Sequence, residues 1–165
     1  MAYRLLLVDD DERLLAAMKR VLKKEGYNLM FARNPAEGFE KLRLKRVDLI
    51  ISDYRMPGMD GVEFLKEVKE LYPDVVTIMM TGVDDAHVAM KAINEAGVYK
   101  FLLKPCGSEM LKISVRRTLE TLALIRERDS LLARLREYDM LLARLEEKHS
   151  GITDVRRDED GFIIG

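Results

Sequence analysis

The sequence contains one cysteine, Cys106, so no disulfide can form within the chain, and this favours a reducing compartment. It also lacks long hydrophobic runs. The apolar stretch near the N-terminus is too short for the core of a signal peptide, and no later run approaches the length of a membrane span. These absences predict a cytoplasmic protein that makes no contact with a membrane.

An excess of charge of one sign is missing as well. The chain has 28 Lys and Arg against 29 Asp and Glu, a formal net charge of -1, so no overall attraction to nucleic acid is expected. Apolar residues at 48% and charged residues at 35% are typical of a soluble globular protein. A length of 165 residues allows one domain with a full core and an additional segment.

Strand-like and helix-like segments alternate through the first 105 residues. The helix-like segments carry apolar residues at helical spacing, whereas the strand-like ones are short and apolar. Five such repeats predict an α/β fold: a flavodoxin-like, doubly wound, five-stranded parallel sheet in the order 2-1-3-4-5. The predicted strands are 3–8, 27–32, 47–52, 75–80 and 99–103.

Several predicted helix ends carry capping residues. Asn34 is placed as an N-cap, Pro35 occupies the first helical position, and Glu37 stands where the glutamate of a capping box belongs. Gly26 and Gly97 are expected to end their helices in the left-handed conformation.

From Ser108 to Ser150 the sequence lacks both glycine and proline, which predicts about 40 residues of helix. Its second half has apolar residues at alternating spacings of about four and three, as in a coiled coil. We expect a core domain over 1–125, a coiled-coil extension of the fifth helix over 126–149 and a tail over 150–165 that could form a short hairpin. The alternative is an amphipathic helix folded back on the core. The proposed seam consists of Leu131, Leu135, Tyr138, Leu142, Leu145 and His149.

Three acidic residues follow predicted strands that should lie side by side. Asp9 and Asp10 end the first strand and Asp53 ends the third, so their carboxylates should converge at one sheet edge. Such carboxylates repel one another unless a cation balances them, and an all-oxygen set of this size suits Mg²⁺. Helix capping is the competing interpretation for Asp9, Asp10 and Asp11 taken alone.

Lys104 and Thr81 end the fifth and fourth predicted strands at the same edge. Each has a plainer interpretation, a solvated surface charge for Lys104 and a strand-end turn for Thr81. Together with Asp53 and a divalent cation, they predict a phosphoryl-transfer site in which the Asp53 carboxylate is the nucleophile. Because the sequence has no P-loop or glycine-rich nucleotide loop, the phosphoryl donor should be a separate molecule.

Four motifs, LLLVDDD, ISDYRMPGMDG, IMMTG and FLLKP, resemble in order and spacing those of the receiver domains of two-component response regulators. The resemblance covers about residues 1–125. It implies that Asp53 is the phospho-acceptor and that Asp10 binds Mg²⁺ directly, supported by Asp9. The backbone carbonyl of Arg55 would be a further metal ligand, and Thr81 and Lys104 would bind the phosphoryl oxygens.

The resemblance also implies a switch and a cis peptide. Phe101 stands where the family has its switch aromatic, commonly tyrosine, and its ring is expected to follow the Thr81 hydroxyl on phosphorylation. Lys104–Pro105 would be cis. Cys106 is uncommon after that proline, and we interpret it as a small packing residue rather than a reactive thiol.

The expected partners follow from the same resemblance. They are a sensor histidine kinase, a downstream effector protein or domain, and a second copy bound through the fourth helix, fifth strand, fifth helix and coiled coil. The protein would then catalyse only its own phosphoryl transfer and dephosphorylation. The segment AINEAGVYKFLLKP resembles receivers linked to HD-type phosphodiesterases or hydrogenase-type regulators. One alternative is therefore a receiver and linker of a larger enzyme, such as a cyclic-dinucleotide phosphodiesterase. Another is a dimerising adaptor that is never phosphorylated.

Overall fold

The structure, a computed structural model, describes residues 1–149, apart from the side chains of Val83, Ala86 and Ala89. The chain divides into two units, Met1–Leu122 and Ala123–Gly165. The tail over 150–165, for which a hairpin was predicted, lies outside the described residues. Among the described helices, none is both long and apolar enough to cross a membrane.

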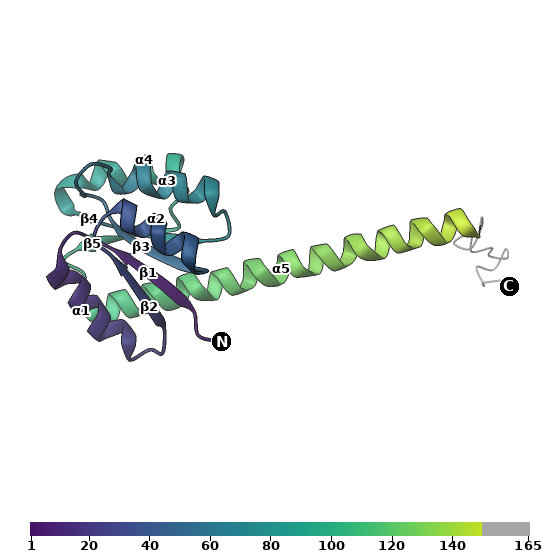
Figure 1. Cartoon of the computed structure of the whole chain (residues 1–165), viewed down its shortest axis with the longest axis horizontal. Helices are drawn as coiled ribbons and strands as arrows, with labels where there is room; N and C mark the ends of the chain where they lie inside the picture. The colour runs from purple at the N-terminus through teal and green to yellow at the C-terminus, as the bar shows by residue number, and fades with distance from the viewer. Residues whose placement is uncertain (150–165) are drawn as a thin grey trace, which may run out of the picture. The chain divides into compact units, whose positions relative to one another are not determined.

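Within residues 1–149, five parallel strands form one sheet in the order β2-β1-β3-β4-β5, which confirms the predicted topology (Figure 1). Each observed strand begins one or two residues later than predicted, because the first apolar residues of each segment precede the paired ladder. The strands are β1 (Arg4–Val8), β2 (Asn28–Ala32), β3 (Leu49–Asp53), β4 (Val76–Gly82) and β5 (Lys100–Lys104).

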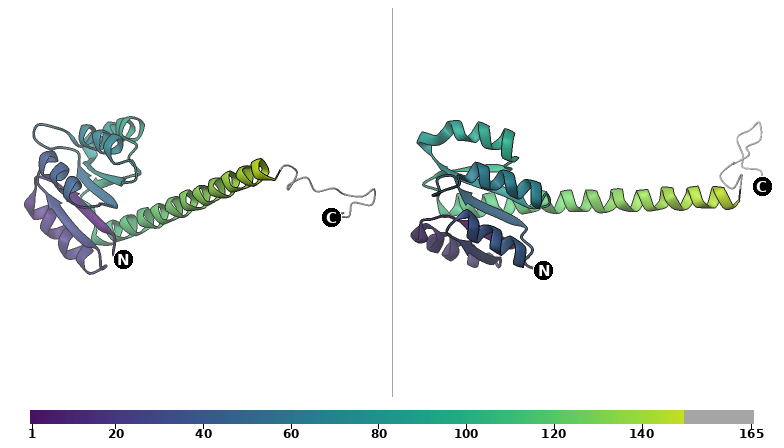
Figure 2. Two further views of the ribbon diagram at one scale, coloured as in Figure 1. Left: turned by 45° about the vertical axis from the view of Figure 1, so that its right-hand side comes forward. Right: turned by 45° about the horizontal axis from the view of Figure 1, so that its top comes forward.

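Helices connect the strands and cover both faces of the sheet. Residues of β1, β3 and β4 that point to one face pack with α2, α3 and α4, and those that point to the other pack with α1 and the start of α5 (Figures 1 and 2). β3 is buried along its whole length, as expected for a central strand covered on both faces. The helices are α1 (Glu12–Lys23), α2 (Pro35–Leu44), α3 (Gly61–Leu71), α4 (Ala86–Ala96) and α5 (Ser108–Lys148).

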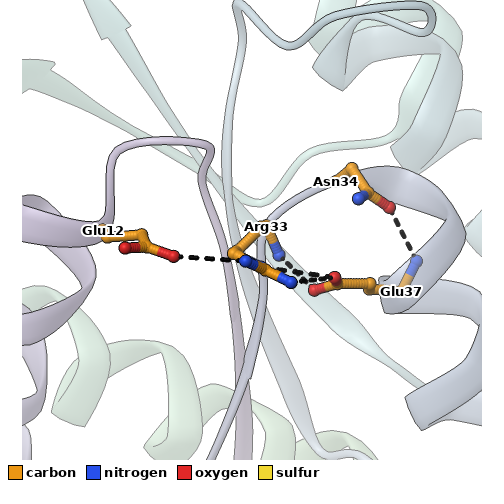
Figure 3. Close-up of polar contacts among 4 residues, drawn as sticks. All are labelled: Glu12, Arg33, Asn34 and Glu37. Carbon is orange, nitrogen blue, oxygen red and sulfur yellow. Dashed lines mark hydrogen bonds and ion pairs between the residues drawn. The ribbon is translucent and has the colours of Figure 1, made fainter.

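The predicted caps are mostly present. Gly97 ends α4 with φ 58°, and Asn34 caps α2 by accepting a hydrogen bond from the Glu37 backbone N–H at 2.8 Å. The Glu37 carboxylate, however, accepts from the backbone N–H of Arg33 at 2.8 Å. Figure 3 shows that the Arg33 guanidinium lies between Glu37 and Glu12, at 3.1 Å and 3.3 Å, so it joins the starts of α2 and α1.

The helix predicted from Ser108 is continuous over 41 residues, Ser108–Lys148. Up to Leu122 it belongs to the first unit, where Leu111, Val115 and Leu119 are buried against the sheet. In the second unit the leucines of the predicted seam are exposed, for example 51% for Leu131 and 49% for Leu142.

Candidate functional site

The predicted site residues lie together at the carboxyl edge of the sheet. Asp53 is the last residue of β3 and pairs with Met80 of β4. On the next pair of strands, Thr81 lies opposite Leu103 and Gly82 opposite Lys104. Because parallel strands end at one edge, the ladder brings these residues into neighbouring rows.

The three predicted acids form a cluster. Carboxylate oxygens of Asp9, Asp10 and Asp53 lie within 4.8 Å of one another. Asp9 is 1% and Asp53 8% exposed, whereas Asp10 is open to solvent. Helix capping falls to Asp11 alone, whose Oδ1 accepts from the backbone N–H groups of α1, so it does not explain Asp9 or Asp10. Asp9 instead accepts from the Asp11 backbone N–H at 2.8 Å.

The Lys104 ammonium is the counter-charge within this cluster. Its Nζ lies 2.8 Å from Asp53 Oδ1 and 3.1 Å from Asp9 Oδ2. Partial burial by itself would lower the pKa of Lys104, but its hydrogen bonds and charge interactions with Asp53 and Asp9 outweigh burial and raise that pKa. Lys104 therefore carries its charge throughout the neutral range.

The pKa of Asp9 is raised, and burial is the largest cause. Repulsion by Asp53 adds to the rise, while the Asp11 backbone N–H and the Lys104 ammonium oppose it. The sequence predicted mutual repulsion of the carboxylates, and the structure adds that desolvation at the sheet edge contributes more.

The two predicted switch residues lie on neighbouring strands, Thr81 on β4 and Phe101 on β5, in different environments. Thr81 is 1% exposed, and its Oγ1 has no hydrogen-bond partner within the described residues. Phe101 is half-buried on β5 and packs against the core on the α3 and α4 face. The Lys104–Pro105 peptide is cis.

Gly61, the last residue of the ISDYRMPGMDG motif, closes the loop that follows β3. Its backbone N–H donates to the Tyr54 carbonyl at 2.7 Å. A Cβ at Gly61 would lie 2.3 Å from the Asp53 carbonyl oxygen and 2.9 Å from the Tyr54 Cα. The adjacent Asp60 begins α3 through a capping box with Glu63. The Gly that follows Asp60 in the motif is the signal that could have indicated this close approach.

An ion pair between Arg55 and Asp85 was not predicted from the sequence. Arg55 Nε and Nη2 donate to the two carboxylate oxygens of Asp85, each at 2.7 Å. Asp85 directly precedes α4, and its side chain is 11% exposed against 71% for Arg55. The sequence contains the acidic pair Asp84 and Asp85 before a predicted helix, but its spacing does not identify an ion-pair partner 30 residues away.

The donor set of the acid cluster fits a hard divalent cation. Asp9, Asp10 and Asp53 offer only oxygen as ligand atoms. A carboxylate beside an ammonium and an unpartnered hydroxyl is suited to accept a phosphoryl group.

Comparison with known proteins agrees with this geometry. The family model described as the response regulator receiver domain matches residues 5–116. The hydrogenase transcriptional regulatory protein HoxA of Cupriavidus necator is 38% identical over 119 residues, which are 72% of this chain and 24% of that protein. The chain thus spans about a quarter of the length of this curated relative.

Two solved structures are similar over most of the chain. The signal receiver domain of an HD domain-containing protein from Pseudomonas fluorescens Pf-5 has 34% identity and a TM-score of 0.72, covering 74% of this chain and 98% of that one. A structure from Rhodopirellula baltica described as an adenylate cyclase has 32% identity and a TM-score of 0.76, covering 81% and 98%. The predicted likeness to receivers of HD-type and hydrogenase-type regulators is confirmed, and the chain belongs to the receiver domain family of two-component response regulators.

Proposed function

We propose that Asp53 accepts a phosphoryl group from a sensor histidine kinase in a reaction that depends on Mg²⁺. The observation that carries this proposal is the Lys104 ammonium, held 2.8 Å from Asp53 Oδ1 within an all-oxygen cluster of acids. Asp10, Asp53 and the Arg55 backbone carbonyl would hold the metal, with Asp9 in support. When bound, the metal neutralises charge on the phosphoryl oxygens.

The chain's own residues divide the work of transfer. A carboxylate oxygen of Asp53 attacks phosphorus and forms the acyl phosphate, while the bond from phosphorus to the donor nitrogen breaks. Lys104 balances the charge on the transferring group, as its contacts with Asp53 and Asp9 already place it at the reacting carboxylate. Burial of Asp53 at 8% exposure keeps one face of the carboxylate away from bulk water.

Thr81 and Phe101 would convert phosphorylation into a change of packing. The Thr81 hydroxyl is buried and has no partner within the described residues, so a phosphoryl oxygen offers it a hydrogen bond. When the hydroxyl turns to the phosphoryl group, the half-buried Phe101 ring moves into the space beside β4. A local charge thereby biases the surface formed by α4 and β5.

Phosphorylation by acetyl phosphate tests the role of Asp53. Wild-type protein with Mg²⁺ should gain the mass of one phosphoryl group, and Asp53→Asn should gain none. Asp10→Asn is expected to react slowly and to respond weakly to added Mg²⁺. Equal gain in wild type and Asp53→Asn, or no gain in either, would disprove the proposal.

We also propose that the protein is a homodimer through α4, β5, α5 and the coiled coil. On α4 and β5, the exposed apolar residues are Met90 at 68%, Ile93 at 51% and Leu103 at 53%. In the coiled coil, the exposed seam of Leu131 to Leu145 would be buried between two helices.

Charge favours a parallel arrangement of the coil. With Leu135 and Leu142 at the a positions, Arg134 falls at g and Asp139 at the following e position. In a parallel, in-register pair, Arg134 of one helix would face Asp139 of the second copy, which is an attractive contact.

Sedimentation tests the coil with two matched substitutions. Leu142 and Met140 are similarly exposed in the single chain, at 49% and 57%, but only Leu142 lies on the seam. Leu142→Gln should weaken self-association strongly, whereas Met140→Gln should not. A chain ending near Arg126 should also associate more weakly than the full chain. If all these proteins are monomers, the coiled-coil proposal is wrong.

The output is proposed to be a downstream effector protein or domain to which the coil transmits the switch. A second candidate is a receiver and linker of a larger output enzyme, such as a cyclic-dinucleotide phosphodiesterase. The names of the two similar structures, an HD domain-containing protein and an adenylate cyclase, support this second candidate, because both describe a receiver-like chain as part of an enzyme or a larger protein. Determining whether the coding frame continues past Gly165 separates the two candidates.

A further inference from the structure

A bidentate ion pair ties the loop after β3 to the start of α4. Both carboxylate oxygens of Asp85 are held at 2.7 Å by the guanidinium of Arg55. The same carboxylate reaches back over the end of β4, where Asp85 Oδ2 lies 3.9 Å from the position of a Cβ built on Gly82. The ion pair thus lies beside Gly82, the residue that follows Thr81 in β4.

Asp85 also holds the N-cap position of α4, yet within the described residues its side chain makes no capping hydrogen bond. The three preceding helices are capped by Asp11, Asn34 and Asp60, each of which accepts from backbone N–H groups of its first turn. An aspartate is among the best N-cap residues. Its carboxylate at α4 is instead engaged with Arg55 through both oxygens, and in that position it does not cap the helix.

The ion pair lies at the phosphorylation site itself. A hollow of about 280 Å³ is lined by Asp53, Lys104 and Arg55 together with Asp84 and Asp85. A group attached to Asp53 would therefore share one hollow with the Arg55 guanidinium and with two carboxylates of the loop before α4.

We propose that the phosphoryl group on Asp53 takes Arg55 from Asp85, and that the released Asp85 carboxylate then caps α4. In this scheme the Arg55 side chain positions the phosphoryl group. When Arg55 leaves Asp85, the Asp85 carboxylate changes its contacts and caps α4. The inference rests on the proposed function, since it requires a phosphoryl group on Asp53.

The exchange follows from the charges involved. A phosphoryl group brings about 1.5 to 2 negative charges and three acceptor oxygens, more than the single charge of the Asp85 carboxylate. It also repels Asp84 and Asp85, which line the same hollow. The Arg55 side chain is 71% exposed, so no close packing hinders its movement. Release of Asp85 is then favoured by the new contact, by relief of repulsion and by the attraction of a carboxylate to the N-terminus of α4.

The test uses the full chain with Mg²⁺ and beryllofluoride, a stable phosphoryl analogue. Formation of the cap is measured by amide hydrogen exchange at His87 and Val88, the second and third residues of α4, because a capping carboxylate bonds these N–H groups and slows their exchange. In wild type, beryllofluoride should slow exchange at these amides about threefold or more. The Arg55 Nε–H resonance should shift in the same titration.

Three variants separate the steps. Arg55→Gln should leave Asp85 free, so His87 and Val88 should already be protected without beryllofluoride. Asp85→Ala should show little protection in either state. Arg33→Gln is the matched control, because Arg33 makes a comparable ion pair at the same sheet edge, to Glu37 and Glu12, and should behave as wild type (Figure 3).

The outcomes distinguish this inference from the proposed function. If acetyl phosphate adds no mass to wild type, the proposed function fails and the exchange fails with it. If wild type is phosphorylated but His87 and Val88 do not respond, or if Arg55→Gln exchanges like wild type, the exchange alone is overturned.

Discussion

Substitution of Gly61 by Ala tests how closely the loop after Asp53 is closed. The new Cβ would lie 2.3 Å from the Asp53 carbonyl oxygen, 2.9 Å from the Tyr54 Cα and 3.1 Å from the Asp53 carbonyl carbon. Carbon atoms in contact normally lie about 3.5 Å or more apart. All three neighbours are backbone atoms, so no side chain can rotate away, and the chain at the phospho-acceptor must move.

We expect Gly61→Ala to lower the free energy of unfolding by about 2 to 3 kcal/mol, the upper part of the range for overpacking. A better helix propensity of Ala offsets this by at most about 1 kcal/mol, and less at the first residue of a helix. The hydrogen bond from the Gly61 N–H to the Tyr54 carbonyl would also lengthen from 2.7 Å. Displacement of Asp53 should slow phosphorylation by acetyl phosphate as well.

Gly107→Ala provides the control. Gly107 lies near the same sheet edge, after Lys104, and a Cβ there would have no heavy atom within 4 Å. It should be neutral or stabilising by up to about 1 kcal/mol, because Ala restricts the unfolded chain. Urea unfolding followed by circular dichroism, at one protein concentration, gives both values. Equal stability of the two variants would refute the close approach at Gly61.

Three further predictions concern single side chains. Thr81→Val removes a buried hydroxyl that has no hydrogen-bond partner within residues 1–149. The free energy of unfolding of the unphosphorylated protein, measured by urea titration, should therefore rise by about 1 kcal/mol. A fall would show that the hydroxyl is hydrogen-bonded. Lys104→Met leaves Asp9 and Asp53 without their cation. The free energy of unfolding of the metal-free protein should fall by about 2 kcal/mol, less than the roughly 3 to 5 kcal/mol for a fully buried pair, because the Lys104 side chain is 28% exposed. Added Mg²⁺ should restore part of this loss, and an unchanged free energy of unfolding would contradict the prediction. Burial raises the pKa of the Cys106 thiol above its ordinary value, so the fold favours the neutral thiol and loses stability as the pH rises through that pKa. The midpoint of the pH dependence of alkylation by iodoacetamide should accordingly lie at higher pH in the folded protein than in the urea-unfolded chain, and an equal or lower midpoint would contradict the burial.

The strand order and the long α5 were predictable because each rests on a regular pattern. Alternating apolar segments specify a doubly wound sheet, and the absence of Gly and Pro after Ser108 allows one helix. The meeting of Asp9, Asp53 and Lys104 was predictable for a related reason, since the ends of parallel strands share one edge.

Other features depended on where loops come together. The Arg55–Asp85 ion pair joins two loops 30 residues apart, and neither residue type nor spacing identifies such a partner. The cap of α2 differs for a similar reason: the Glu37 side chain accepts from Arg33, and Arg33 is in turn held by Glu12 of another helix. Side chains in loops have several partners within reach, and packing selects among them.

The sequence by itself determined the fold class, the residues at the carboxyl edge of the sheet and the apolar seam of the C-terminal helix, because periodicity and strand order are local properties that survive without coordinates. Only the tertiary structure decided how that edge is balanced electrostatically. It showed that burial rather than repulsion is the larger cause of the raised Asp9 pKa, that the Thr81 hydroxyl lacks a partner within residues 1–149, and that Asp85 is held by Arg55. Desolvation and hydrogen-bond pairing depend on which atoms surround a group in space, and that is set when distant segments pack together.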